Sequence, residues 1–394
     1  MPLNHASRRE FLQTGAAAAA AGAFTIVAPQ SVRGTQANSK ISVGLIGAGN
    51  RGSADCKIVH ADPRARVTAL CDVFPDQFEK AKKTIGVENP EVYSDFEKLL
   101  ASPNIDAVFI VTPPFEHPRM FEAAVQARKH IYLEKPIGVD VQGCKRTLAA
   151  SKKADPAKNI AVGFQARYSP AYLEAYKRIQ NDELGKIATA RGGQILPNMW
   201  NRRPFSDPKE EHLRNWFAYR DYSGDFIVEQ DCHNIDVLHW FLGDVPISAV
   251  GHCSKKLRLD YDTNDNFSVI YVWPGDVLVN FEANQLTVGG YRREGEEFSG
   301  PKGSIIMSRA KMLHYKGSDN WSRDFAKPNV EEFAVKREIT IDEIENFLDR
   351  IVNNNPENAI ERSVWSTCIA LLGREAAYTK REVTWKGFIG EMSA

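Results

Sequence analysis

A lysine at the end of an apolar stretch is the first candidate for chemistry in this chain. Lys135 follows residues 130–133 and lies between Glu134 and Pro136. Its apolar neighbours would partly remove the side chain from water, which favours the neutral amine and lets it exchange a proton with a substrate hydroxyl. A lysine in a solvated loop is the competing interpretation.

A second group of candidates shares one face of a helix predicted over residues 224–240. Its members, at i, i+4, i+7 and i+11, are Glu229, His233, Asp236 and Trp240. An acid beside an imidazole holds the base in one tautomer, so His233 is a candidate acid or base with Glu229 as its partner. Asp231 is an alternative acid, although its spacing places it on another face.

The same helix leaves two other interpretations open. The acid and the histidine could form a surface ion pair, or Glu229, His233 and Asp236 could bind a divalent metal. The helix lacks a second histidine at a matching spacing. We therefore predict no metal site.

A glycine-rich turn within residues 41–52 predicts where a cofactor binds. An apolar strand runs into Gly47, Gly49 and Gly52 in the pattern Gly-x-Gly-x-x-Gly. These glycines permit a tight turn, a close approach of backbone N–H groups to a pyrophosphate, and close packing of the next helix. The N-terminal end of that helix favours phosphate groups. The other predicted cofactor contacts of the turn are Ala48, Asn50 and Arg51.

An acidic residue supports the dinucleotide and selects its kind. A second strand, residues 66–71, ends at Asp72, about 20 residues past the last glycine, where a carboxylate can bind the adenine ribose hydroxyls. A carboxylate there would repel a 2′-phosphate, so Asp72 favours NAD over NADP. Arg64 and Arg66 lie nearby in the sequence and weaken that preference.

Alternating strands and helices position these residues. Strands at 106–111 and 130–133 flank a helix at 116–127, a pattern typical of an α/β domain with a doubly wound parallel sheet. Ligands of such sheets bind at the carboxyl ends of the strands. The chain places the loop 112–117 and the segment Glu134-Lys135-Pro136 there.

The second half of the chain predicts an α+β domain with a large, mostly antiparallel open sheet. The predicted elements are strands at 245–253, 266–273 and 276–284 and helices at 341–352 and 363–378. We divide the chain into a leader and linker (1–39), a dinucleotide-binding domain (40–160) and a substrate and oligomerisation domain (161–394). The last predicted helix is expected to pack back on the first domain.

Taken together, the motifs resemble those of the glucose-fructose oxidoreductase, inositol dehydrogenase and rhizopine-catabolism (Gfo/Idh/MocA) family. The resemblance covers nearly the whole chain past Lys40. The motifs that carry it, besides the glycine turn, are Thr112-Pro113-x-x-x-His117, Glu134-Lys135-Pro136, Gly163-Phe-Gln165-Ala-Arg167-Tyr168-x-Pro170 and Gly185-Lys186-Ile187. The resemblance implies a Rossmann dinucleotide-binding domain and an oxidoreductase that acts on a sugar or polyol.

The resemblance also implies roles for single residues. Lys135 and His233 would manage the hydroxyl proton, and Glu229 stands where the family commonly carries the aspartate of Asp-x-x-x-His. The peptide bond before Pro136 would be cis. The further predicted cofactor contacts are Thr112, Pro113, His117, Glu134 and Lys135. The predicted substrate contacts are Lys135, Arg167, His233 and Asp236.

An aromatic and basic excursion separates the two groups of motifs. Within residues 196–222 it contains Trp200, Arg202, Arg203, Trp216, Tyr219 and Arg220. Aromatic faces with guanidinium groups suit carbohydrate. A loop that packs on its own domain or on a neighbouring subunit explains the composition equally well.

The N-terminus predicts export. Ser7-Arg8-Arg9-Glu10-Phe11-Leu12 is a twin-arginine pattern, and an alanine-rich run follows it. The run is shorter than the roughly 20 apolar residues of a confident membrane span. We therefore expect export through the twin-arginine machinery to a periplasmic or other extracytoplasmic site. Because free NAD is scarce there, the cofactor would leave the cytoplasm tightly bound to the folded enzyme.

The amino-acid composition limits which binding partners are expected. With 50 basic and 50 acidic side chains, the chain has no electrostatic reason to bind nucleic acid. Its six cysteines form no Cys-x-x-Cys pair, and we expect no structural disulfide. By the family resemblance, the open face of the second sheet would pair with another subunit in a homo-oligomer.

Three functions fit these observations. The first is an NAD-dependent oxidoreductase that transfers hydride between a secondary hydroxyl of a sugar, sugar derivative or polyol and its nicotinamide cofactor. The second is a glycoside-processing enzyme whose resident NAD is reduced only transiently. The third is a sensor that has lost catalysis, against which the presence of both Lys135 and His233 argues.

Overall fold

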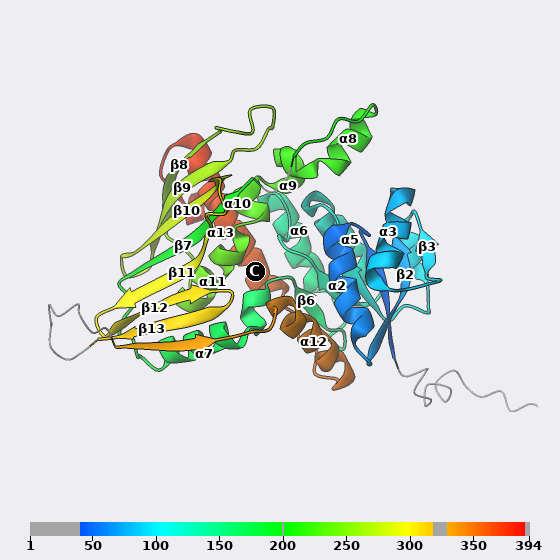
Figure 1. The fold of residues 1–394 in the computed structure, drawn as a ribbon, viewed down its shortest axis with the longest axis horizontal. Coiled ribbons are helices and arrows are strands. Elements are labelled where there is room, and N and C mark those ends of the chain that lie inside the picture. The colour runs from blue at the N-terminus through cyan, green and yellow to red at the C-terminus, as the bar shows by residue number, and fades with distance from the viewer. Residues whose placement is uncertain (1–39, 199–200, 318–328, 391–394) are drawn as a thin grey trace, which may run out of the picture. The chain divides into compact units, whose positions relative to one another are not determined.

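The computed structural model describes residues 40–198, 201–317 and 329–390. The twin-arginine pattern at Arg8 and Arg9 and Trp200 of the aromatic and basic excursion lie outside the described residues. From Ile41 onward the described residues belong to one unit. Two sheets dominate this unit (Figure 1).

The first sheet has six parallel strands in the order β3-β2-β1-β4-β5-β6. Its strands are β1 (Ile41–Ile46), β2 (Ala65–Cys71), β3 (Glu91–Tyr93), β4 (Ala107–Ile110), β5 (His130–Leu133) and β6 (Ile160–Val162). The strands β1 and β4 are buried throughout, as expected for parallel strands covered on both faces. The doubly wound parallel sheet is confirmed, and its strand order reverses beside β1, where ligands of such sheets bind.

Helices from both ends of the chain cover this sheet. The helices that follow its strands are α2 (Asn50–Ala61), α3 (Pro75–Ile85), α4 (Phe96–Ala101), α5 (His117–Gln126) and α6 (Val141–Ser151). A late helix, α12 (Ile339–Val352), joins α2 and α3 on one face, where its Phe347 ring meets the rings of Phe109 and Tyr132. The first sheet is therefore completed by residues that come after all but the last strand of the second sheet in the sequence.

The second sheet has nine strands and is antiparallel except for the pair β7 and β10. Its strands are β7 (Thr189–Pro197), β8 (Ser248–Ser254), β9 (Asn266–Trp273), β10 (Val277–Thr287), β11 (Arg293–Gly300), β12 (Gly303–Ser308), β13 (Lys311–Lys316), β14 (Val330–Ala334) and β15 (Val383–Thr384). Burial alternates along β9 and β10, so one face is covered and the other is open. The predicted mostly antiparallel open sheet is confirmed.

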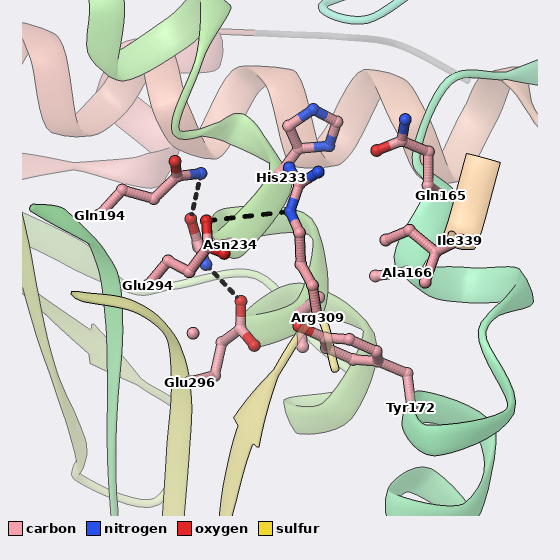
Figure 2. Close-up of a pocket in the computed structure, with 12 residues that line it drawn as sticks. Gln165, Ala166, Tyr172, Gln194, His233, Asn234, Glu294, Glu296, Arg309 and Ile339 are labelled. Carbon is pink, nitrogen blue, oxygen red and sulfur yellow. Dashed lines mark hydrogen bonds and ion pairs between the residues drawn. The ribbon is translucent and has the colours of Figure 1, made fainter. Parts of the chain in front are cut away.

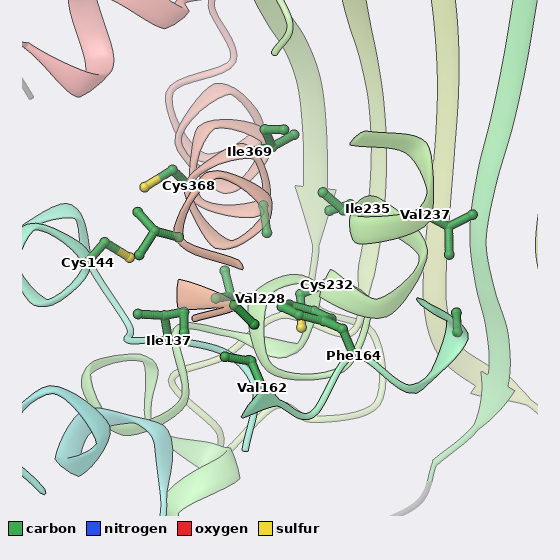
Figure 3. Close-up of a cluster of buried hydrophobic side chains, with 14 of the residues drawn as sticks. Ile137, Cys144, Val162, Phe164, Val228, Cys232, Ile235, Val237, Cys368 and Ile369 are labelled. Carbon is green, nitrogen blue, oxygen red and sulfur yellow. The ribbon is translucent and has the colours of Figure 1, made fainter. Parts of the chain in front are cut away.

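The remaining helices lie around and between the two sheets. They are α7 (Pro170–Gln180), α8 (Pro208–Arg214), α9 (Arg220–Ser223), α10 (Phe226–Glu229), α11 (Cys232–Leu242), α13 (Ile360–Thr379) and α14 (Trp385–Ile389), with the short 3₁₀ helices η2 (Pro114–Glu116), η3 (Gln165–Tyr168) and η4 (Trp216–Ala218). Their apolar side chains form a core continuous with that of the first sheet. In Figure 3, Cys144 of α6 lies close to Cys368 of α13, and Val162 of β6 lies near Val228 of α10.

The structure can be compared with two further predictions, one about a domain boundary and one about a helix. The boundary placed at residue 160 falls at the first residue of β6, which pairs with β5 in the first sheet. The domain limits otherwise stay a prediction. The helix predicted over residues 224–240 is wrong as a single element, because α10 ends at Glu229 and α11 begins at Cys232.

A contact with the first sheet accompanies the break between α10 and α11. The backbone carbonyl of Glu229, which would bond an amide of the next turn in a continuous helix, accepts a hydrogen bond from Lys135 Nζ instead. The chain turns at Gln230 and Asp231 before α11 begins. A contact with a residue far away in the sequence therefore lies at the point where the regular helical pattern stops.

Candidate active site

The glycine turn fits a dinucleotide. Gly47 has φ +95°, and a Cβ on it would lie 2.4 Å from the carbonyl oxygen of Val111. A Cβ on Gly52 would lie 2.2 Å from the Gly47 oxygen, so α2 packs directly on the turn. A Cβ on Gly49 would meet no atom within 4 Å. The turn is thus closed toward the protein and open beyond Gly49, at the N-terminal end of α2, where a pyrophosphate would be bound.

Asp72 lies at the end of β2, beside this turn. Its carboxylate accepts hydrogen bonds from the amides of Ala48 and Phe74, each at 2.9 Å. Each oxygen keeps a second lone pair for a ribose hydroxyl. Arg64, one of the two arginines that could have weakened the preference for NAD, pairs with Asp62 and Asp349 instead.

The loop after β4 is joined to the loop after β5 by His117. This buried imidazole lies 2.7 Å from the Pro136 oxygen through Nδ1 and 2.9 Å from the Thr112 oxygen through Nε2. Burial lowers the pKa of His117. His117 therefore braces Thr112 and Pro113 against the Lys135 loop, whereas its contact with a cofactor stays a prediction.

Glu134 ties the glycine turn to the same loop. One carboxylate oxygen accepts a hydrogen bond from Arg51 Nε at 2.8 Å, and the other accepts one from the Lys135 amide at 2.9 Å. A Cβ on Gly163 would lie 2.9 Å from this carboxylate, which explains a glycine there. The Arg51 side chain is therefore directed toward Glu134 and, at 3.1 Å, Asp55.

Lys135 reaches from the first sheet to the helices of the second. The peptide bond between Lys135 and Pro136 is cis, as the resemblance implied. The ammonium group donates to the Glu229 carbonyl at the end of α10. The structure thus brings Lys135 to the segment that carries Glu229 and His233.

His233 lies in the first turn of α11 and is only partly buried as a residue. Desolvation lowers the pKa of its imidazole well below the usual value, and the positive charge of Lys135 adds to this effect. Its ring lies edge-on to Phe164, with centroids 6.1 Å apart. A neutral imidazole at neutral pH can accept a proton.

Two carboxyl groups lie near this histidine in sequence. Burial raises the pKa of Glu229 to about 7, against the charges of Lys135 and Arg258. Burial raises the pKa of Asp231 well above its usual value, and neither of its carboxyl oxygens has a hydrogen-bond partner among the described residues. Both acids are therefore able to hold a proton near neutral pH.

Arg167 and Asp236, which we predicted to contact substrate, bind each other. Arg167 donates to the two Asp236 oxygens from Nε and Nη2, with shortest distances of 2.8 Å, and Ser366 donates to the same carboxylate at 2.7 Å. Asp236 is fully buried, and the Arg167 guanidinium lies 5.3 Å from the Trp240 ring centre. The pair fastens η3 to α11, and its contact with substrate stays a prediction.

A pocket lies beside His233, between α11 and the second sheet (Figure 2). Gln194 of β7 donates to Asn234 at 2.9 Å, and Asn234 donates to the buried Glu296 of β11 at 2.5 Å. The second Glu296 oxygen has no hydrogen-bond partner among the described residues. Arg309 and Glu294 also line the pocket.

Sequence reasoning missed the polar residues of this pocket. One signal was available: Glu296 occupies an inward-facing position of β11, two residues before the buried Phe298. A charged residue on the core face of an alternating strand is costly to bury unless it has a partner or a ligand. Asn234 and Gln194 carried no comparable signal.

The structure also bears on metals, cysteines and membranes. In the described part of the chain, no group of three or more histidine, cysteine, aspartate or glutamate side chains is arranged to bind a metal. All six cysteines are free. None of the helices described here has the length and apolar character needed to cross a membrane.

Comparisons with known proteins agree with this architecture. Residues 41–164 match the model of an oxidoreductase family with an NAD-binding Rossmann fold, and residues 172–306 match the Gfo/Idh/MocA C-terminal domain. The inositol 2-dehydrogenase of Rhizobium meliloti (strain 1021) is 26% identical over 319 residues, which cover 79% of this chain and 88% of the relative.

Solved structures share the fold. A levoglucosan dehydrogenase in complex with NADH and levoglucosan has a TM-score of 0.74 at 22% identity, covering 88% of this chain and 99% of that one. The scyllo-inositol dehydrogenase of Lactobacillus casei with bound NAD(H) and scyllo-inositol has a TM-score of 0.69 at 22% identity, with the same coverage. Both family models together span most of the described residues, and the chain belongs to the Gfo/Idh/MocA family of oxidoreductases.

Proposed function

We propose that this oxidoreductase transfers hydride between a secondary hydroxyl of a sugar, sugar derivative or polyol and a tightly held NAD. The observation that carries the proposal is the meeting of Lys135 with the α10–α11 break, beside His233 and next to the glycine turn. NAD supplies the hydride acceptor at its nicotinamide ring. The protein orients the reactants and moves the hydroxyl proton.

Lys135 and His233 divide the proton transfer in this proposal. A neutral His233 accepts the hydroxyl proton during oxidation, and Lys135, fixed by the Glu229 carbonyl, donates a hydrogen bond to the oxygen as charge develops on it. The reverse transfers return the proton during reduction.

The substrate class rests on the pocket beside His233 and on the relatives. The free space in this pocket is about 20 Å³, and the buried Glu296 carboxyl and Arg309 that line it suit a hydroxyl group. The related proteins are named as dehydrogenases of inositols and of levoglucosan.

A panel assay tests the proposal. The protein is mixed with NAD and with myo-inositol, scyllo-inositol, levoglucosan, free hexoses or glycosides, and absorbance near 340 nm is followed while products are identified. We expect lasting NADH formation with at least one polyol or sugar. Product release without lasting reduction would favour the glycoside-processing alternative, and inertness across the panel would favour the sensor.

The Lys135→Ala variant tests the assigned chemistry. We expect kcat/KM to fall about a thousandfold, since general acid–base groups contribute on that order, while NADH binding persists. Lys153→Ala, at an exposed lysine of the same domain, is the matched control and should keep full activity. Full turnover by Lys135→Ala would contradict the mechanism.

Export and assembly belong to the same proposal. The twin-arginine leader would deliver the folded protein with its NAD to an extracytoplasmic compartment, and replacing Arg8 and Arg9 by lysine should retain it in the cytoplasm. The open face of the second sheet carries exposed Val250, Ile270 and Leu278 on adjacent strands, which suits a homo-oligomer interface. An Ile270→Glu variant should lower the mass measured by light scattering.

A further inference from the structure

A segment between β7 and α10 reaches back from the second sheet to the first. We name residues 202–223 the clasp; it contains α8, η4 and α9. In Figure 1, α8 lies above α5 and α3, and side-chain contacts join the clasp to two segments that follow strands of the first sheet. Nothing in the proposed reaction uses these contacts.

The clasp has a polar centre of its own. The buried carboxylate of Glu211 accepts hydrogen bonds from Arg202 Nε at 2.7 Å, from Asn215 Nδ2 at 2.8 Å and from the Tyr219 hydroxyl. His212 stacks on Tyr219 with ring centroids 4.0 Å apart. These contacts stiffen the segment before it meets the first sheet, so the side chains that it presents are held in position.

The first contact lies where the loop after β2 runs into the first turn of α3. Arg214 Nη2 pairs with Asp76 at 2.6 Å, and its guanidinium carbon lies 3.9 Å from the centre of the Phe74 ring. These partners follow Asp72 by two and four residues. The Arg214 charge also reaches Asp72, where it opposes the effect of burial on the pKa of that carboxyl. The clasp is thus fastened where the adenosine half of a dinucleotide would be recognised.

The second contact lies at the loop after β4. The Tyr222 ring packs on Phe115 with centroids 4.3 Å apart. Phe115 belongs to η2, within the predicted cofactor-contacting loop that begins at Thr112. His212 connects the two contacts, since its ring centre lies 5.8 Å from that of Tyr222.

The order of the strands shows where the two contacts lie relative to the glycine turn. Strand β1 lies between β2 and β4 in the first sheet, so the loop after β1, which is the glycine turn, lies between the two anchored loops. A segment fastened to both neighbours spans the turn on the side where the carboxyl ends of the strands open. We propose that the clasp completes the dinucleotide site and retains the cofactor, with Arg214 and Tyr222 as its two fasteners.

The inference rests on the proposed binding of NAD and assigns its retention to named residues. A dinucleotide beneath the clasp leaves only after the Arg214 and Tyr222 contacts have opened. The two contacts hold different ends of one stiff segment, so weakening either one raises the rate of dissociation, and weakening both raises it further.

The NADH dissociation rate tests the inference directly. Full-length protein is loaded with NADH, excess NAD is added, and the loss of nicotinamide fluorescence is followed by stopped flow. We expect Arg214→Ala to dissociate about ten times faster than the wild type, because it removes a cation–π contact and an ion pair. Tyr222→Ala should dissociate about three to ten times faster, and the double variant faster than either.

The matched control uses the same carboxylate. Lys80 pairs with Asp76 at 2.7 Å from within α3 and belongs to the first sheet's own helix. Lys80→Ala should therefore keep the wild-type dissociation rate. Circular dichroism melts without cofactor check that each variant is folded.

The outcomes separate this inference from the proposed function. Wild-type dissociation rates in both folded fastener variants would overturn the clasp while leaving NAD binding intact. An equal acceleration in Lys80→Ala would overturn it too, because the effect would then belong to α3. A wild-type protein that binds no NADH at all would overturn both proposals. No sugar substrate enters the measurement.

Discussion

The cofactor side of the site, around the glycine turn, and the substrate side, around α10 and α11, are held in place by different kinds of contact. On the cofactor side, contacts of the backbone fix the geometry. Gly47 and Gly52 leave no room for a Cβ, and backbone amides hold the Asp72 carboxylate. On the substrate side, buried pairs of charged side chains, such as Arg167 with Asp236, fix the geometry. Steric change should therefore damage the first side, and change of charge the second.

The largest effect is expected at Gly52. A valine there would place its Cβ 2.2 Å from the Gly47 oxygen, and the backbone cannot yield without opening the turn. We expect the free energy of unfolding to fall by about 4 kcal/mol or more, with NADH binding lost. Urea unfolding followed by circular dichroism measures the change. A Gly52→Val protein of wild-type stability would show that the turn is not sterically closed.

Arg167→Ala tests the substrate side. It leaves the fully buried Asp236 carboxylate without its cation, which typically costs about 3 to 5 kcal/mol. Urea unfolding again provides the measurement. Replacing the pair together, as Arg167→Met with Asp236→Leu, should recover most of the loss, because no unpaired charge stays buried. A double variant as unstable as the single one would refute this electrostatic explanation.

Glu229, on the substrate side, should make the free energy of unfolding depend on pH. Its pKa is raised from 4.5 in the unfolded chain to about 7 in the folded protein, so between these values the folded state binds the extra proton. Its contribution to stability is present below pH 4.5 and is lost as the pH rises to about 7, a change of about 3 kcal/mol. The difference in unfolding free energy between wild type and Glu229→Gln, measured from pH 4.5 to 8, should change by this amount. A constant difference would refute the raised pKa.

The smallest effect on stability is expected at Gly49. Its φ of −71° suits any residue, and an added Cβ meets no atom within 4 Å. Gly49→Ala should change the unfolding free energy by less than about 0.5 kcal/mol. It should nevertheless weaken NADH binding about tenfold or more, because the methyl group occupies the space predicted for the pyrophosphate. Titration of NADH fluorescence measures the affinity, and unchanged affinity would place the pyrophosphate elsewhere.

The same contrast explains what the sequence could predict. The glycine turn, Asp72 and the strand β5 depend on local pattern, and the structure has β5 at the predicted residues 130–133. The break after Glu229 could not be predicted, since the carbonyl left free there bonds Lys135, far away in the chain. The pairing of Arg167 with Asp236 was missed for the same reason: periodicity assigns a face to a residue but not a partner.

The pocket and the clasp extend this lesson. Glu296 gave a readable signal because a charge on the core face of a strand is costly. Arg214 gave none, because an arginine in an aromatic-rich excursion suits a sugar, a subunit or its own protein equally well. Only the fold places it against Phe74 and Asp76. The excursion that we considered for carbohydrate meets the cofactor domain at these residues.

The late helix α12 has a consequence for how the protein is made. Phe347 fills the space against Phe109 and Tyr132, and the Tyr132 hydroxyl donates to Glu343 at 2.8 Å. These partners leave the ribosome only after strands β7 to β14 of the second sheet have been synthesised. The nucleotide-binding half of the enzyme, although translated first, cannot finish folding first. Its core is complete only once α12 has emerged.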